Sequence, residues 1–152
     1  MAAPVLDYRR HFHLPLEPDR LWDRIGEFDQ FEQWWPWLTG FRVEGCGLAN
    51  GSVLHGIVSP PLPYRMRLRV ELVDCHRPRS IEAVVDGDLT GEASLRLYPD
   101  DGATRAEVAW TVEMHQPAMR LASRFGHPLL QWGHDRVVEM TVAGFRRGIA
   151  RS

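Results

Sequence analysis

The segment LLQWGHDRVVEMTVAGFRRGI, residues 129–149, decides the fold because it is the longest stretch with helical periodicity in the chain. Its spacing predicts one inward stripe, made of Leu130, His134, Val137, Val138, Thr141, Phe145 and Ile149. The opposite side carries Gln131, Asp135, Glu139 and Arg146. Residues 118–125 are also helix-prone, but the Gly-His-Pro sequence at 126–128 predicts an interruption between the two pieces. We therefore expect a long amphipathic C-terminal helix.

The chain between residues 40 and 114 is typical of strands joined by turns. In YRMRLRVEL, residues 64–72, every second residue is apolar and the residues between them are charged. This period of two predicts a half-buried antiparallel strand. Other strands are expected at 8–16, 41–45, 52–58, 81–87, 91–98 and 105–114.

Two short helices are expected between the first strand and the second, at residues 17–28 and 30–35. The second must end near Pro36, since a residue before proline avoids the helical region. A seven-stranded antiparallel sheet with one apolar face needs a cover, and the last helix is the only long amphipathic element available. We therefore predict an α+β fold in which a curved sheet wraps around the C-terminal helix, with a cavity between the two.

Length and charge narrow the class of protein. The chain has 152 residues, which fits a single domain spanning 1–152. Its net charge is −2, and its 18 basic residues are all arginines dispersed among acids, which argues against a nucleic-acid partner. No apolar run approaches the roughly 20 residues that span a bilayer, so we expect no stable membrane insertion. The N-terminal residues lack a signal-peptide pattern, and a cytoplasmic monomer or homodimer is the default expectation.

The sequence offers no standard catalytic or cofactor motif. His11 and His13 share one strand face, but two imidazoles without a third ligand make a poor metal site. No phosphate-binding glycine loop and no nucleophile elbow are found. We therefore expect neither a metal nor an organic cofactor.

The segment FEQWWPW, residues 31–37, holds three of the six tryptophans. These rings can be core, or one of them, Trp35 or Trp37, can line the cavity, since a pocket wall is a core with one side missing. A membrane wedge is disfavoured by the acidic neighbours Asp29 and Glu32. A platform for stacking nucleic-acid bases is disfavoured because it would need a basic groove.

His134 is the main candidate for chemistry, because it falls on the inward stripe of the last helix. It is either a hydrogen-bonded core residue or a polar cavity group that contacts a ligand carbonyl or moves a proton near pH 7. Asp135 is expected to be solvated and unable to orient it, since helix neighbours do not face each other. His55 is ambiguous: either Val53, His55 and Ile57 point inward, or Leu54, Gly56 and Val58 do.

Three segments resemble those of the START/Bet v 1-like (SRPBCC) superfamily, in particular its bacterial polyketide cyclase/dehydrase-like proteins. They are LPLEPDRLWDRIGEFDQFEQWWPW, RPRSIEAVVDGDLTGEASLRLYPDDGATRAEVAW and QWGHDRVVEM. The resemblance covers nearly the whole chain and implies a helix-grip fold with an internal pocket for an apolar small molecule. It assigns no catalytic residue.

Two functions follow as hypotheses. The first is binding of a hydrophobic molecule, aromatic, polyketide-like or lipid-like, without chemistry. The second is a cofactor-independent cyclase, aromatase or dehydratase in which His134 is catalytic and Tyr64 or His55 assists. An interaction module would instead present a large exposed apolar patch. The expected ligand-binding residues are Trp35, Trp37, His55, Tyr64, Met66, Leu68, Leu95, Trp110 and His134.

Overall fold

The structure is a computed structural model that describes residues 5–60, 65–115 and 117–150, without the side chains of 117–131 and 133. The seven strands are β1 (Val5–Leu14), β2 (Leu38–Glu44), β3 (Val53–Val58), β4 (Met66–His76), β5 (Ser80–Gly87), β6 (Leu89–Asp100) and β7 (Ala103–Met114). The helices are α1 (Pro18–Ile25), a single 3-10 turn η1 (Phe28–Gln30), α2 (Phe31–Trp34) and α3 (Pro117–Ala150).

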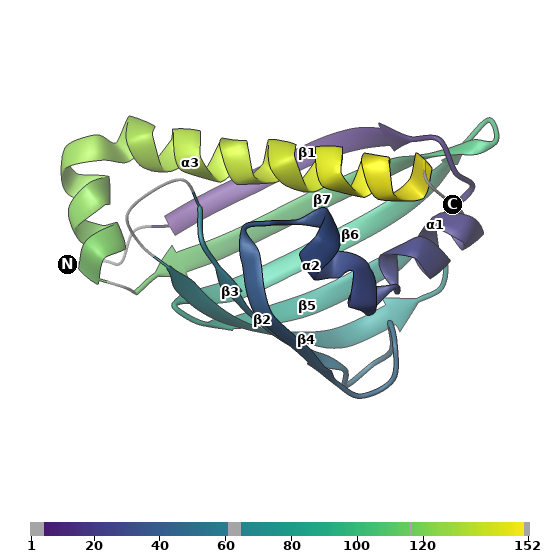
Figure 1. Cartoon of the computed structure of the whole chain (residues 1–152), viewed down its shortest axis with the longest axis horizontal. Coiled ribbons are helices and arrows are strands. Elements are labelled where there is room, and N and C mark those ends of the chain that lie inside the picture. The colour runs from purple at the N-terminus through teal and green to yellow at the C-terminus, as the bar shows by residue number, and fades with distance from the viewer. Residues whose placement is uncertain (1–4, 61–64, 116, 151–152) are drawn as a thin grey trace.

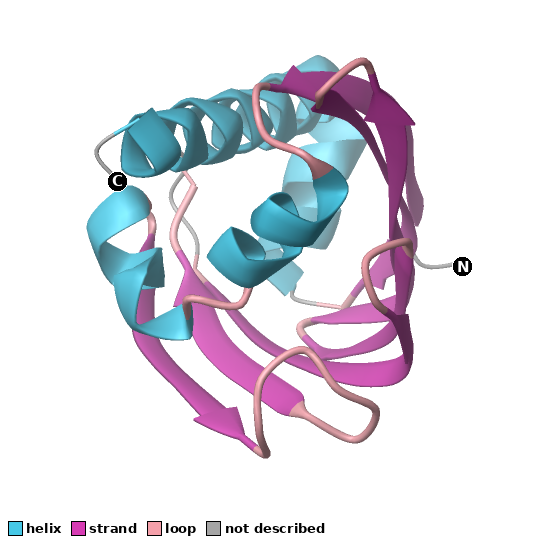
Figure 2. Ribbon diagram, turned by 90° about the vertical axis from the view of Figure 1, so that its right-hand side faces the viewer, coloured by secondary structure: helices cyan, strands magenta, loops and turns pink. Residues whose placement is uncertain are grey.

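All seven strands form one antiparallel sheet in the order β1-β7-β6-β5-β4-β3-β2. The chain runs from β2 to β7 as a meander, and β1 joins the far edge beside β7 (Figure 1). The first strand was predicted at 8–16 and is found at 5–14, so Leu16 lies beyond it. Figure 2 shows the sheet curving around α3, with the short helices in its opening. The predicted helix-grip architecture is confirmed.

The predicted interruption of the last helix at residues 126–128 is wrong. Helix α3 is continuous over 34 residues and passes through Gly126 and Pro128. A proline inside a helix removes one hydrogen bond and usually bends the axis without ending the helix. Figure 1 shows such a change of direction in the green, N-terminal part of α3.

The short helices are fixed to both the sheet and α3. Leu21 of α1 is completely buried. The buried Thr104 hydroxyl of β7 donates to the carbonyl oxygen of Leu16 at 2.6 Å, just before α1 begins. Arg24 Nη2 donates to the carbonyl oxygen of Gly148 near the end of α3, at 2.8 Å. These two hydrogen bonds fix the position of the short helices in the opening of the curved sheet.

Helix α3 approaches α2 closely at two glycines. A Cβ added at Gly144 would lie 2.2 Å from the carbonyl oxygen of Trp34, and one added at Gly148 would lie 2.2 Å from Trp34 Nε1. Trp34 is buried there and meets Phe145 edge-on, with ring centroids 5.3 Å apart. The spacing of four residues places both glycines on one helix face, where Gly144 makes room for the Trp34 carbonyl group and Gly148 for its indole.

Candidate functional site

A cavity of about 480 Å³ lies between the inner face of the sheet and α3. Every strand except β2 contributes to its wall, and helix α3 contributes the residues from His134 to Phe145 that share one face. The cavity is lined by Leu6, Phe12, Leu14, Ile25, Phe31, Trp35, Trp37, Val58, Pro60, Met66, Leu68, Val70, Val85, Leu89, Ala93, Leu95, Ala106, Val108, Trp110, Val112, Met114, His134, Val137, Val138, Thr141, Val142 and Phe145.

Seven of the nine predicted ligand-binding residues line this cavity. They are Trp35, Trp37, Met66, Leu68, Leu95, Trp110 and His134. Tyr64 lies outside the described residues. The strand residues were found from strict alternation, which fixes the side of the sheet that each side chain occupies.

His55 is not among the lining residues, and the pairing of β3 with β4 explains why. His55 stands opposite Arg69, whereas Val58 stands opposite Met66. Directly paired residues share a face of the sheet, so His55 lies on the outer face, where its Nε2 is 3.3 Å from Glu44 Oε1. The alternative with Leu54, Gly56 and Val58 inward is the one found, and we withdraw His55 from the candidate site.

Both tryptophans that flank Pro36 reach the cavity. Trp35 has an extended backbone, with φ −128° and ψ 96°, as expected of a residue before proline. Residues 35–38 then form a tight turn, closed by the Leu38 backbone N–H that donates to the carbonyl oxygen of Trp35 at 3.1 Å, and this turn brings the two indoles together. The rings of Trp35 and Trp37 accordingly stack, 5.6 Å apart and inclined by 17°. Trp34 points elsewhere, toward the glycines of α3.

The two stacked indoles differ in their hydrogen bonding. Trp35 Nε1 donates to the carbonyl oxygen of Thr141 at 2.8 Å. The Thr141 hydroxyl donates in turn to the carbonyl oxygen of Val137 at 2.7 Å. Trp37 Nε1 is buried and has no hydrogen-bond partner in the part of the chain that the structure describes. One cavity-lining indole is thus satisfied by the protein and the other is not.

At the wall formed by β1, β7 and α3, two aromatic rings pack against His134. Tyr8 and Trp110 are cross-strand partners and stack, with centroids 4.4 Å apart. His134 meets both edge-on, at 4.7 Å from Tyr8 and 5.3 Å from Trp110. Sequence reasoning missed Tyr8, although it shares strand parity with the inward residues Phe12 and Leu14. This shared alternation along the first strand would have identified Tyr8 as an inward-facing residue.

The tautomer of His134 follows from its neighbour. Trp110 Nε1 donates to His134 Nε2 at 3.0 Å. Because an indole N–H is only a donor, Nε2 must be the unprotonated nitrogen and Nδ1 carries the hydrogen. Nδ1 lies 3.3 Å from Asp135 Oδ1. The expectation that Asp135 cannot reach His134 is therefore wrong: both side chains bend toward each other across a single residue step.

Burial lowers the pKa of His134 below its usual value of 6.5, and this outweighs the contact with Asp135, which raises the pKa. The Arg10 guanidinium lowers it further. Burial likewise raises the pKa of Tyr8, whose buried hydroxyl has no hydrogen-bond partner among the described residues. Both groups are neutral near pH 7. The site thus presents an uncharged imidazole whose lone pair is already engaged.

The family of polyketide cyclase / dehydrase and lipid transport proteins matches residues 6–151. The chain belongs to this family. No curated protein matches the sequence.

Solved structures share the fold of this family member at low sequence identity. A conserved protein from Geobacillus kaustophilus has a TM-score of 0.80 at 13% identity, with 97% of each chain covered. The Zhui aromatase/cyclase from Streptomyces sp. R1128 has a TM-score of 0.74 at 12% identity, covering 97% of this chain and 95% of that one. Norcoclaurine synthase from Thalictrum flavum, in complex with dopamine and hydroxybenzaldehyde, has a TM-score of 0.66 at 9% identity, covering 99% and 89%.

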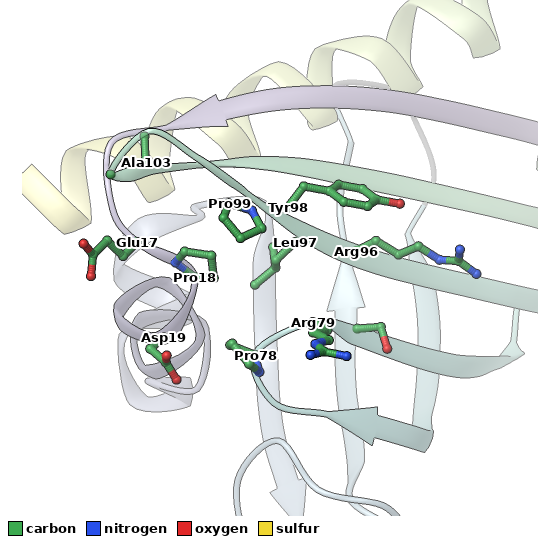
Figure 3. Close-up of a pocket in the computed structure, with 12 residues that line it drawn as sticks. Glu17, Pro18, Asp19, Pro78, Arg79, Arg96, Leu97, Tyr98, Pro99 and Ala103 are labelled. Carbon is green, nitrogen blue, oxygen red and sulfur yellow. The ribbon is translucent and has the colours of Figure 1, made fainter.

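A second depression, of about 720 Å³, lies on the surface beside α1 (Figure 3). Its wall mixes acidic and basic side chains, among them Glu17, Asp19, Arg79 and Arg96, all of them exposed. Exposed charges of both signs bind solvent well, so this groove offers a ligand less than the apolar cavity does. Figure 3 shows the carboxylates on the α1 side and the guanidinium groups on the sheet side.

Other kinds of site find little support in the described part of the chain. No group of three or more His, Cys, Asp or Glu residues there is placed to hold a metal ion. His11 and His13 contact Glu107 and Asp100 instead. None of the described helices is both long and apolar enough to cross a bilayer. Exposed large apolar side chains among the described residues are limited to Val5, Val73, Val84 and Trp132.

Proposed function

We propose that this protein binds a hydrophobic small molecule, aromatic, polyketide-like or lipid-like, in the cavity between the sheet and α3. One observation carries the proposal: the wall is apolar apart from five side chains, and four of these use their polar atoms within the protein. The five are Trp35, Trp37, Trp110, His134 and Thr141. A wall of this kind attracts apolar surface and offers little to a strongly polar solute.

The size of the cavity supports the same proposal. About 480 Å³ falls within the range of roughly 300–1,000 Å³ that is usual for small-molecule sites. Each Å² of apolar ligand surface removed from water contributes about 25 cal/mol. The stacked indoles and the ring cluster at His134 keep the wall rigid, which limits the entropy lost on binding.

Native mass spectrometry of the protein purified from its own host tests this proposal directly. We expect a retained apolar molecule that organic extraction releases, or stoichiometric uptake of an apolar probe after extraction. A protein that carries no such molecule and takes up no apolar probe would contradict the proposal.

A second candidate, a cofactor-independent enzyme of the cyclase, aromatase or dehydratase type, is favoured by one observation. His134 is the only lining residue, among those described, with an ionisable side chain. As a base, Nε2 would accept a proton from carbon next to a ligand carbonyl, leaving an enolate and an imidazolium, and would later return the proton. This requires Trp110 to release Nε2 first, which is why we rank binding ahead of chemistry.

Deuterium exchange separates the two candidates. The bicyclic ketone 2-tetralone carries exchangeable hydrogens next to its carbonyl group. If His134 acts as a base, the protein accelerates their exchange in D₂O, and His134→Gln loses the acceleration while still binding the ketone. Bound ketone that exchanges at the uncatalysed rate would contradict the enzymatic role and leave the binding role intact.

The remaining proposals concern the cellular location, oligomeric state and partners of the protein. We propose that it works as a cytoplasmic monomer or homodimer, with no nucleic-acid partner, no stable membrane insertion and no cofactor. The net charge of −2 and the lack of a basic patch in the sequence support the absence of a nucleic-acid partner.

A further inference from the structure

We infer that protonation of His134 releases the ligand, so that the cavity holds an apolar molecule at neutral pH and gives it up on acidification. This inference rests on the proposed function, and it adds the regulation of the same site. The device consists of one imidazole in the cavity wall and the two hydrogen bonds that hold it.

His134 is placed to change the charge of an otherwise uncharged wall. It is the only ionisable side chain among the described residues that line the cavity. Only 13% of its side chain is exposed, and the rings of Tyr8 and Trp110 pack against it edge-on. Of the described lining residues, His134 is therefore the one that can bring a charge into the wall near neutral pH.

The bond from Trp110 ties this change of charge to the shape of the wall. Trp110 Nε1 donates to His134 Nε2 at 3.0 Å, which requires an unprotonated nitrogen. A protonated Nε2 and the indole N–H are two donors that face each other, and neither can accept. One of the two rings must then turn, and both of them line the cavity. Protonation therefore disturbs the surface that a ligand contacts.

Two charged groups face the imidazole among the described residues, and they oppose each other. Asp135 on α3 lies 3.3 Å from Nδ1 and stabilises the charged ring, whereas Arg10 on β1 repels it. Tyr8 on β1 is neutral near pH 7, and Trp110 on β7 carries no charge. Burial is the largest influence on the pKa of His134 and lowers it. What fills the cavity beside the ring should therefore affect its protonation.

An apolar ligand should lower the pKa of His134 further. The ligand replaces water beside the ring with hydrocarbon, which disfavours the charged imidazolium. Binding and protonation are linked reciprocally, so a ligand that lowers the pKa must bind more weakly to the protonated protein. The affinity is complete above the pKa of the free protein and falls as the pH falls through it.

The experiment measures the dissociation constant of fluorene, a three-ring hydrocarbon without a titratable group, between about pH 5 and about pH 8. Circular dichroism shows at each pH that the protein is folded. For the wild type we expect the constant to rise below the pKa of the free protein, by up to about tenfold per pH unit. His134→Gln should give a flat profile.

The chain provides a matched control and a pair of opposed variants. His55 lies on the outer face of the sheet, so His55→Gln should keep the wild-type profile. Asp135→Asn removes a group that favours the imidazolium and should move release to lower pH. Trp110→Phe removes the donor that holds Nε2 unprotonated and should move release to higher pH. The readout is the pH at which affinity falls, which a general loss of affinity does not shift.

A second measurement needs no variant. NMR titration of the His134 imidazole in wild-type protein should give a lower pKa with fluorene bound than without it. An equal or higher pKa in the complex, an affinity independent of pH, or a ring that stays neutral wherever the free protein is folded would overturn the inference while the proposed function stands. Failure of fluorene to bind at any pH would instead overturn the proposed function.

Discussion

At the scale of single residues, the hydrogen bond from Trp110 bears on the protonation of His134. The indole N–H donates to the nitrogen that would otherwise take up a proton. A hydrogen bond that is made only to the neutral form of a group disfavours its charged form. Burial first and the Arg10 guanidinium second lower the pKa of His134, and the bond from Trp110 should act in the same direction.

Replacing Trp110 with phenylalanine should raise the pKa of His134. The wall keeps most of its aromatic surface, but Nε2 loses the donor that holds it unprotonated. NMR titration of the imidazole resonances measures the change, with Trp35→Phe as the control because that indole bonds to Thr141. A pKa that stays in place or falls in Trp110→Phe would show that the bond has no influence.

His134 should also make the stability of the protein depend on pH. The pKa of His134 is 6.5 in the unfolded chain and lower in the folded protein. At a pH between the folded and the unfolded pKa, the unfolded chain therefore binds more protons than the folded protein. The free energy of unfolding therefore rises with pH through this window, and the contribution is lost as pH falls through the folded pKa.

Denaturation midpoints of the wild type and of His134→Gln, measured between about pH 5 and about pH 8, test this sign. The wild type should lose more stability on acidification than the variant does. Parallel pH profiles for the two proteins would contradict the proposed buried, neutral imidazole.

Residue-level features were predictable from the sequence only where one strand or one helix determined them. Alternation located Met66, Leu68, Leu95 and Trp110, and helical spacing located His134. The facing of His55 depended on how β3 pairs with β4, which a strand of ambiguous alternation does not reveal. The contact between His134 and Asp135 depended on side-chain rotamers, which no sequence periodicity encodes.

At the scale of elements, the contact between α2 and α3 depends on two glycines of α3, although glycine has a low helix propensity. Gly144 and Gly148 lie in the C-terminal part of α3, and inside a helix alanine is ordinarily better than glycine by about 1 kcal/mol. They are tolerated because Trp34 occupies the space that a methyl group would need.

Changing Gly144 or Gly148 to alanine should therefore destabilise the protein, against the usual helix preference. We expect a loss of about 1–3 kcal/mol in the free energy of unfolding, as is typical of overpacking. Gly144 should be the more costly of the two, since the added carbon meets backbone at Trp34 and not a movable side chain. Urea denaturation measures the loss.

The exposed Arg136 supplies the control for this prediction, because Arg136→Ala changes the same helix without entering the α2–α3 contact. It should change the free energy of unfolding by about 0.5 kcal/mol or less. Alanine variants of the glycines as stable as the wild type would refute the close-packing explanation. The sequence predicted both helices but not this contact, since it joins elements about 110 residues apart and neither glycine has a local signature.

At the scale of the whole molecule, the sheet and α3 enclose more space than their own side chains fill. A strongly curved seven-stranded sheet packs against a single helix, and the short helices cover one end of the opening (Figure 2). The order of elements predicted this architecture. The volume that remains unfilled could not be predicted, because it depends on how α3 is placed over residues as small as Ala93 and Ala106.

Fluorene binding, compared between the wild type and Ala93→Phe, tests whether the cavity holds an apolar ligand. Ala93 lines the cavity from β6, and a phenyl group at this position would occupy part of the space that a ligand needs. We expect one bound fluorene per wild-type chain, quenching of the cavity tryptophans, and little or no binding by a variant that still melts cooperatively. Undiminished binding by Ala93→Phe, or none by the wild type, would contradict this expectation.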